Sequence, residues 1–142
     1  MVLHYHIDGG DFVNAGKASS AVKGVLKQLN VPSPRIKRVV IALYETEVNV
    51  VAHASRGEIK VDIDSDKISI QVKDSGPGIP DVEKAMQEGF STASKEVREM
   101  GFGAGMGLPN MKACSDEMHI ASTVGVGTQL SLTIYLNSAG VA

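Results

Sequence analysis

Apolar and polar residues alternate along EIKVDIDSDKISIQVKD, the stretch from Glu58 to Asp74. A period of two residues predicts strands with one buried face. The turn-forming tripeptide Asp-Ser-Asp interrupts the pattern at 64–66, so the two runs predict a β-hairpin. An isolated hairpin is marginally stable in water, because it needs further strands and a cover for its apolar face. The rest of the chain must supply both.

Two segments before the hairpin predict helices that cover this face. Residues 11–30 carry apolar side chains near helical spacing, and Asp11 is expected to cap this helix. The next helix is expected to have Ser33 as its N-cap and Pro34 in its first turn. Its apolar residues recur at positions 36, 39, 40, 43, 44, 48 and 51. Short helices are expected in DVEKAMQEG and LPNMKACSDEM.

Three further segments predict strands: VLHYHID near the start, and HIAST and TQLSLTIYL near the end, with Gly125 and Gly127 between the last two. Strands and helices mix without strict alternation, which favours helices packed on one face of a mixed, mostly antiparallel sheet. The expected fold class is α+β, a two-layer α/β sandwich. The 142 residues suit one domain spanning 1–142.

Charge and composition exclude several classes of partner. The net charge of −2 gives no basic face for nucleic acid. The longest apolar run, Val39 to Tyr44, is too short to span a bilayer, and MVLHYHIDGG lacks the pattern of a signal peptide. The single cysteine, Cys114, cannot form an intrachain disulfide, which fits a reducing cytoplasm. We therefore expect a cytoplasmic protein with no nucleic-acid or membrane partner.

A first polar cluster lies on the second predicted helix. Glu45, Asn49 and His53 are spaced i, i+4 and i+8, so they share one helix face. Two interpretations stay open. The cluster is a solvated helix edge, or it is a carboxylate base beside an amide ligand for a hard cation such as Mg²⁺, which prefers oxygen ligands. Glu47 points elsewhere and is expected at the surface.

A second cluster, DSGPGIP, directly follows a predicted strand and runs from Asp74 to Pro80. It is either an ordinary turn, since its residue types favour turns, or a ligand site. In a ligand site, the carboxylate of Asp74 would accept a proton from a ligand amine. Gly76 and Gly78 would leave room for a flat ring.

A third cluster is the glycine-rich stretch GFGAGMGLPNMK, whose glycines are Gly101, Gly103, Gly105 and Gly107. It is not a Walker A loop, because no Gly-Lys-Ser/Thr follows. It is not the dinucleotide fingerprint either, because Met106 stands where the third glycine belongs. What remains is a glycine-rich loop leading into a helix near Leu108. Backbone N–H groups at such a helix start can bind phosphate.

The order of these motifs resembles the GHKL ATPase superfamily, which contains gyrase, the heat-shock chaperone, histidine kinases and the mismatch-repair ATPase. A helix with Glu-x-x-x-Asn, a strand ending in Asp-x-Gly-x-Gly, a glycine-rich lid and a Gly-Thr before a strand follow one another over residues 45 to 128. The resemblance implies a Bergerat-type sandwich that holds ATP between its helices and the lid.

The same resemblance implies roles for individual residues. Glu45 would be the general base toward an acceptor serine, and Asn49 would bind both nucleotide and Mg²⁺. Asp74 would receive the adenine amino group, with Gly78 beside the ring. Thr128 would support the adenine pocket through its hydroxyl. The remaining nucleotide-binding positions implied are Gly76, Gly101, Gly103, Gly105, Gly107 and Leu108.

Within the superfamily, the chain resembles the small bacterial anti-sigma and switch serine kinases. DSGPGIPDVEKAMQEGFST and GLPNMKACSDEM look most like the switch kinase that phosphorylates STAS-domain proteins. The segment KEVREM looks more like the lid of the anti-sigma-factor kinases. The resemblance implies ATP and Mg²⁺ as cofactors and leaves a homodimer open.

Three functions are compatible with this resemblance. The chain is an ATP-dependent serine/threonine kinase of a STAS-domain partner, or an anti-sigma factor that sequesters a sigma factor and exchanges partners under ATP control. The third is a detached histidine-kinase catalytic domain. It is disfavoured, because no helical hairpin with a phosphorylatable histidine precedes the motifs in this sequence.

Overall fold

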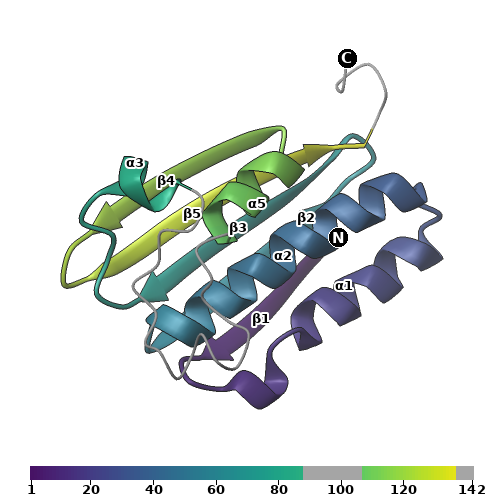
Figure 1. The fold of residues 1–142 in the computed structure, drawn as a ribbon. Helices are drawn as coiled ribbons and strands as arrows, with labels where there is room; N and C mark the ends of the chain where they lie inside the picture. The colour runs from purple at the N-terminus through teal and green to yellow at the C-terminus, as the bar shows by residue number, and fades with distance from the viewer. Residues whose placement is uncertain (88–106, 137–142) are drawn as a thin grey trace.

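A computed structural model of the chain describes residues 1–87 and 107–136. Figure 1 shows a single sheet with α1, α2 and α5 side by side on one of its faces. The strands are β1 (Val2–Asp8), β2 (Arg56–Ile63), β3 (Lys67–Ser75), β4 (Glu117–Thr123) and β5 (Gly127–Tyr135). The helices are the 3-10 turn η1 (Phe12–Asn14), α1 (Lys17–Gln28), α2 (Ser33–His53), α3 (Val82–Ala85) and α5 (Gly107–Cys114).

The strand order in the sheet is β1-β2-β3-β5-β4, and every neighbouring pair of described strands is antiparallel. The predicted α+β sandwich is confirmed. The parallel component implied by a mixed sheet is absent from residues 1–87 and 107–136. The β2–β3 hairpin is confirmed as well. At its turn, the Asp64 carboxylate accepts from the backbone N–H groups of Asp66 and Lys67, at 2.8 and 2.9 Å.

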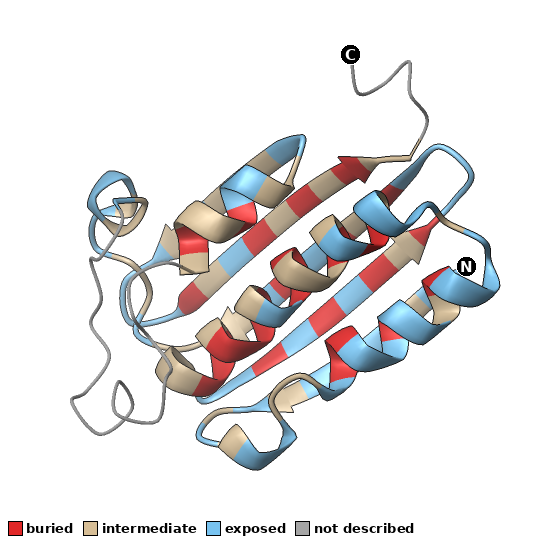
Figure 2. Cartoon of the chain, turned by 45° about the vertical axis from the view of Figure 1, so that its right-hand side comes forward, coloured by how far each residue is buried: buried red, intermediate tan, exposed pale blue. Residues whose placement is uncertain are grey.

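The hydrophobic core lies between the sheet and the three helices. Burial alternates along β2 and β3, so that Ile59, Val61 and Ile70 face the helices while the residues between them face away (Figure 2). Val39 and Leu43 of α2 are completely buried against this layer. Among the described residues, no helix combines the length and apolarity that a membrane span requires.

Glu47 lies inside this packing, which contradicts the prediction that it is a surface residue. Its side chain is completely buried. Its carboxylate accepts from the backbone N–H groups of Gly16, Ala18 and Ser19, at 2.9, 3.2 and 2.7 Å. These donors are at the start of α1, where backbone N–H groups lack partners within the helix and the helix dipole favours negative charge. Glu47 therefore caps α1 from α2.

This long-range cap explains why the predicted Asp11 cap of α1 is wrong, and the predicted Ser33 cap of α2 is wrong as well. Asp11 does not cap α1. Its carboxylate accepts from the side-chain amide of Asn14 at 2.7 Å, and α1 starts only after Gly16, which has a φ of 98°. Helix α2 begins at Ser33 itself, with Pro32 as its N-cap and no side-chain capping bond. Element boundaries are the least reliable part of an assignment made from sequence alone.

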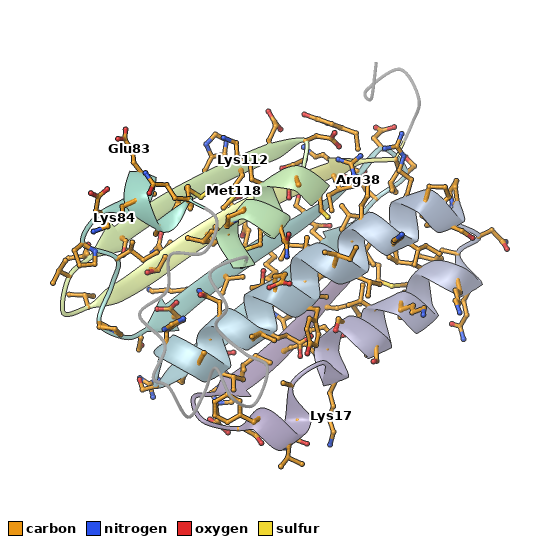
Figure 3. The ribbon with its side chains drawn as sticks, viewed as in Figure 1. Lys17, Arg38, Glu83, Lys84, Lys112 and Met118 are labelled. Carbon is orange, nitrogen blue, oxygen red and sulfur yellow. The ribbon has the colours of Figure 1, made fainter. Side chains whose placement is uncertain are left out.

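Replacing Glu47 by Gln should strongly destabilise the fold. The amide keeps the shape but removes the charge, and its NH₂ group would face backbone donors. Hydrogen bonds to charged groups are strong, and unsatisfied buried groups are costly, so we expect a loss of about 2–4 kcal/mol in the free energy of unfolding, measured in urea. Glu83→Gln, on the exposed surface of α3, is the matched control (Figure 3). Equal urea midpoints of unfolding for Glu47→Gln and Glu83→Gln would contradict the role of Glu47 as the cap of α1.

Candidate functional site

Glu45 and Asn49 lie one turn apart on α2, and both are partly buried. The side-chain amide of Asn110, in α5, donates to Oε1 of Glu45 at 3.2 Å. Gly107, the first residue of α5, lies close to Oε2 of Glu45, since a Cβ at position 107 would be 3.5 Å from that oxygen. Glu45 is therefore not simply a solvated helix edge, because its carboxylate meets the start of α5.

An open groove of about 650 Å³ runs along the surface between α1 and α2 and reaches Glu45. Lys17 and Lys23 of α1 give its wall positive charge, and Tyr44 of α2 gives it an aromatic surface. The remaining lining residues are Ala15, Gly16, Ser19, Ser20, Val40 and Ile41. A carboxylate at the edge of an open groove can meet a group that another molecule brings in.

Asp74 is near the end of β3, where its carboxylate is half-buried. Its Oδ1 atom accepts from the backbone N–H of Thr128 at 3.0 Å. Burial raises the pKa of Asp74, and the bond from Thr128 partly opposes this increase. The bond from Thr128 leaves Oδ2 for another donor, as the predicted bond to a ligand amine requires.

Gly127 allows this close contact between β3 and β5. Its φ of 154° is unusual for a side-chain-bearing residue, and a Cβ there would lie 2.0 Å from the backbone oxygen of Asp74. Gly78, with a φ of 74°, packs so closely that a Cβ would lie 2.5 Å from the backbone oxygen of Thr123. At Gly76, a Cβ would lie 3.1 Å from Cα of Ala54. Gly127 and Gly78 are therefore required by the packing of the chain itself, whereas Gly76 is a tight fit. A place for Gly76 and Gly78 beside a flat ring stays a prediction.

Ser122 is a residue of this region that the sequence analysis missed. Its Oγ accepts from the backbone N–H of Ile79 at 2.7 Å and lies 2.9 Å from Oγ1 of Thr128. It also donates to the carbonyl of Gly127 at 3.3 Å. The predicted hydroxyl of Thr128 is thus tied to Ser122, opposite it in the β4–β5 pair. The register of this hairpin was the signal that could have found Ser122.

The other predicted site residues divide into two groups. Leu108 is buried in the core, so its side chain packs against hydrophobic neighbours. Gly101, Gly103 and Gly105 lie outside the described residues, and their phosphate-binding role stays a prediction.

The donor set fits a nucleotide with a shared magnesium ion. Within 1–87 and 107–136, no cluster of three or more His, Cys, Asp or Glu side chains could hold a metal ion alone. Mg²⁺ keeps several waters and is usually bound by one or two protein carboxylates plus substrate phosphates, so Asn49, an amide, would be its candidate protein ligand here, as the resemblance implies. A half-buried acceptor at Asp74 suits an amine-bearing ring.

An antiparallel sheet covered by helices on one face defines a two-layer α+β domain, and it carries these polar groups on α2 and at the end of β3. The chain belongs to the family of the histidine kinase-like ATPase domain, whose pattern matches residues 11–134. Membership of this family implies that the domain binds ATP.

Two relatives show where in this family the chain lies. It is 35% identical over 130 residues to an anti-sigma F factor from Thermoanaerobacter sp. (strain X514), covering 88% of this chain and 87% of that protein. It is 32% identical over 118 residues to the serine/threonine-protein kinase RsbT of Bacillus subtilis (strain 168), covering 80% and 83% of the two chains. The predicted resemblance to anti-sigma factors and switch kinases is confirmed.

The fold is also similar to a chain in the crystal structure of the SiaB–SiaC complex from Pseudomonas aeruginosa. The TM-score is 0.65, with 93% of this chain and 88% of the other covered, at 11% sequence identity. At this identity the likeness concerns the fold alone.

Asp74→Asn should reduce a preference for ATP over GTP. In the parent chain a carboxylate can accept from the adenine amine but faces the guanine carbonyl with like partial charge. In the parent chain we expect ATP to bind roughly tenfold or more tightly than GTP, since sites that pair a polar group discriminate against analogues that lack it. The amide in the variant can donate to the guanine carbonyl instead. Calorimetry with both nucleotides measures the ratio, and Asp62→Asn, on β2, is the control. Equal affinities in the parent chain would refute the role of Asp74.

Proposed function

We propose that the chain is an ATP-dependent serine/threonine protein kinase of the anti-sigma and switch-kinase type, which phosphorylates a STAS-domain partner in the bacterial cytoplasm. The observation that carries this proposal is the position of Glu45. Its carboxylate is at the edge of the groove between α1 and α2 and also contacts the start of α5. A relative that is named a serine/threonine-protein kinase supports the same activity.

In this proposal each part of the site has one task. Asp74 would receive the adenine amino group, and Asn49 would be a protein ligand of Mg²⁺. Gly107 and the preceding glycines, Gly101, Gly103 and Gly105, offer backbone N–H groups to the phosphates. ATP would supply the phosphoryl group, which passes to the serine oxygen as ADP leaves. Glu45 takes the proton of the acceptor serine, a general-base step that typically contributes 10²–10⁴-fold to a rate.

The groove between α1 and α2 is the route by which the acceptor serine would reach Glu45. It is open along the surface, as a protein substrate requires, and Lys17 projects from the start of α1 (Figure 3). With Lys23, this residue would favour an acceptor segment that carries acidic side chains beside its serine. We expect the serine to lie in a loop or at a helix start of a folded partner.

The alternative function is that of an anti-sigma factor that sequesters a sigma factor and exchanges partners under ATP control. The relatives named anti-sigma F factor favour it. Kinase activity and sigma binding are compatible in one protein, and either arrangement leaves room for a homodimer.

Glu45→Gln and Asn49→Ala should fail in different ways. Glu45→Gln should keep ATP affinity and lose transfer by roughly 10²-fold or more, because a base acts during transfer and not in the bound ground state. Asn49→Ala should lose the Mg²⁺-dependent part of ATP affinity, because it removes a ligand of the ion. Calorimetry with and without Mg²⁺ and single-turnover transfer measure the two effects. A parental transfer rate in Glu45→Gln would show that this residue is structural.

Radiolabelled phosphate should pass from ATP to one serine of a cognate STAS-domain protein, and mutation of that serine to alanine should remove the label. The experiment needs the STAS protein and a candidate sigma factor, each incubated with the chain, ATP and Mg²⁺. If no label transfers while the sigma factor binds tightly in an ATP-dependent way, the anti-sigma function replaces the kinase.

A further inference from the structure

Asn110 is the described residue whose side chain donates a hydrogen bond to the carboxylate of Glu45, at 3.2 Å from Oε1. It lies in the stretch GLPNMK, but neither the sequence analysis nor the proposed function gives its side chain a role. The two residues are 65 positions apart in the chain and come from α5 and α2. Their contact therefore depends on how these two helices pack.

Helix α5 is held firmly against α2 along its buried side. Met111, the neighbour of Asn110, is completely buried, and Leu108 is almost so. Thr46, the neighbour of Glu45, donates its hydroxyl to the carbonyl of Ala42 at 2.8 Å and lies 3.7 Å from the sulfur of Met111. The residues adjacent to both partners are thus fixed in the core.

The far end of α5 is fixed by α2 as well. Arg38 of α2 donates from Nε to the carbonyl of Cys114, the last residue of α5, at 3.1 Å. Its guanidinium also pairs with the carboxylate of Asp116 at 3.2 Å. Figure 3 shows Arg38 on α2, toward the end of the helix that begins at Ser33. A cationic side chain at a helix C-terminus satisfies free carbonyls and suits the helix dipole. Asn110 is therefore presented to Glu45 from a fixed scaffold.

We propose that Asn110 is a positioning residue, which orients the Glu45 carboxylate by binding Oε1 so that Oε2 stays available to the acceptor hydroxyl. This inference rests on the proposed function of Glu45 as the base. A side-chain carboxylate on a helix surface can rotate among several conformations, and reaction geometry is sensitive to shifts of about 1 Å, which can cost roughly 10²-fold in rate. An amide that binds one oxygen of Glu45 restricts this rotation, and the amide itself is not basic enough to take the serine proton.

Other titratable groups surround Glu45 and must be kept unchanged in the test. Lys17 and Lys23 come from α1, and Tyr44 precedes Glu45 on α2. Cys114 comes from α5, and the Glu45 carboxylate contributes to raising the pKa of its thiol, after burial as the larger cause. None of these residues is altered in the variants that follow.

The first test uses Asn110→Ala in the full chain with ATP, Mg²⁺ and the partner protein. We expect kcat to fall about 10- to 100-fold while the KM for ATP stays at the parental value, because the variant loses orientation of the base and no nucleotide contact. In a Glu45→Gln background, Asn110→Ala should cost nothing further, because residues that act as a unit are not additive. Lys112→Ala, an exposed change on the same helix, is the control.

The second test uses Asn110→Asp, which keeps the shape but places a second carboxylate beside Glu45. Like charges at close range disfavour ionisation. The acid limb of the pH–rate profile should therefore move to higher pH. The NMR titration midpoint of the Glu45 carboxyl carbon should move in the same direction. Gln71→Glu adds the same charge at an exposed position on β3. This control should shift neither the acid limb of the pH–rate profile nor the NMR titration midpoint.

The outcomes separate this inference from the proposed function. If Glu45→Gln transfers phosphate at the parental rate, the proposed base is wrong. If Glu45→Gln is inactive while Asn110→Ala keeps the parental kcat, the base stands and the positioning role of Asn110 is wrong. An unmoved titration midpoint of Glu45 in Asn110→Asp would also overturn the contact, and this measurement needs no partner protein or activity.

Discussion

The carboxylate of Glu47 holds the start of α1 against the middle of α2, and the groove beside the candidate site depends on this contact. Three backbone N–H groups of α1 donate to it in a fully buried position. Because the two helices share one buried anion, neither can shift along the other without leaving donors unsatisfied. Lys17 and Lys23 of α1 and Glu45 of α2 line the same groove, so this contact helps to set how its two walls face each other.

A second constraint holds the other end of the site together. The end of β3 and the start of β5 approach so closely that only a glycine fits at 127, and this approach brings the backbone N–H of Thr128 to Asp74. Ser122 then joins β4 to the Asp74–Pro80 loop through Ile79. The half-buried carboxylate of Asp74 is therefore positioned by backbone geometry, and its environment follows from the strand register.

The sequence predicted what depends on local pattern and missed what depends on tertiary contact. Alternation found the strands and the β2–β3 hairpin, and motif order found the family. The sequence analysis wrongly placed Glu47 at the surface. Helical periodicity gives the direction of its side chain on α2, but it does not show that the start of α1 lies on that side. Asn110 belongs to the glycine-rich stretch and its following helix, but nothing there showed its role, because its partner is 65 residues away. Asp11 and Ser33 look like caps by residue type, yet α1 is capped from another helix, which no local rule contains.

Glu45 and Glu47 stand two residues apart on α2, and their surroundings give the same side chain two different tasks. Both oxygens of Glu47 accept backbone N–H groups, and the side chain is completely buried, so it has no free oxygen and no path to an incoming hydroxyl. Glu45 instead meets one amide on one oxygen and is at the edge of an open groove. A base must be oriented and still accessible. Of these two carboxylates only Glu45 meets both conditions, which is why our proposal gives the proton transfer to Glu45, while Glu47 holds α1 against α2.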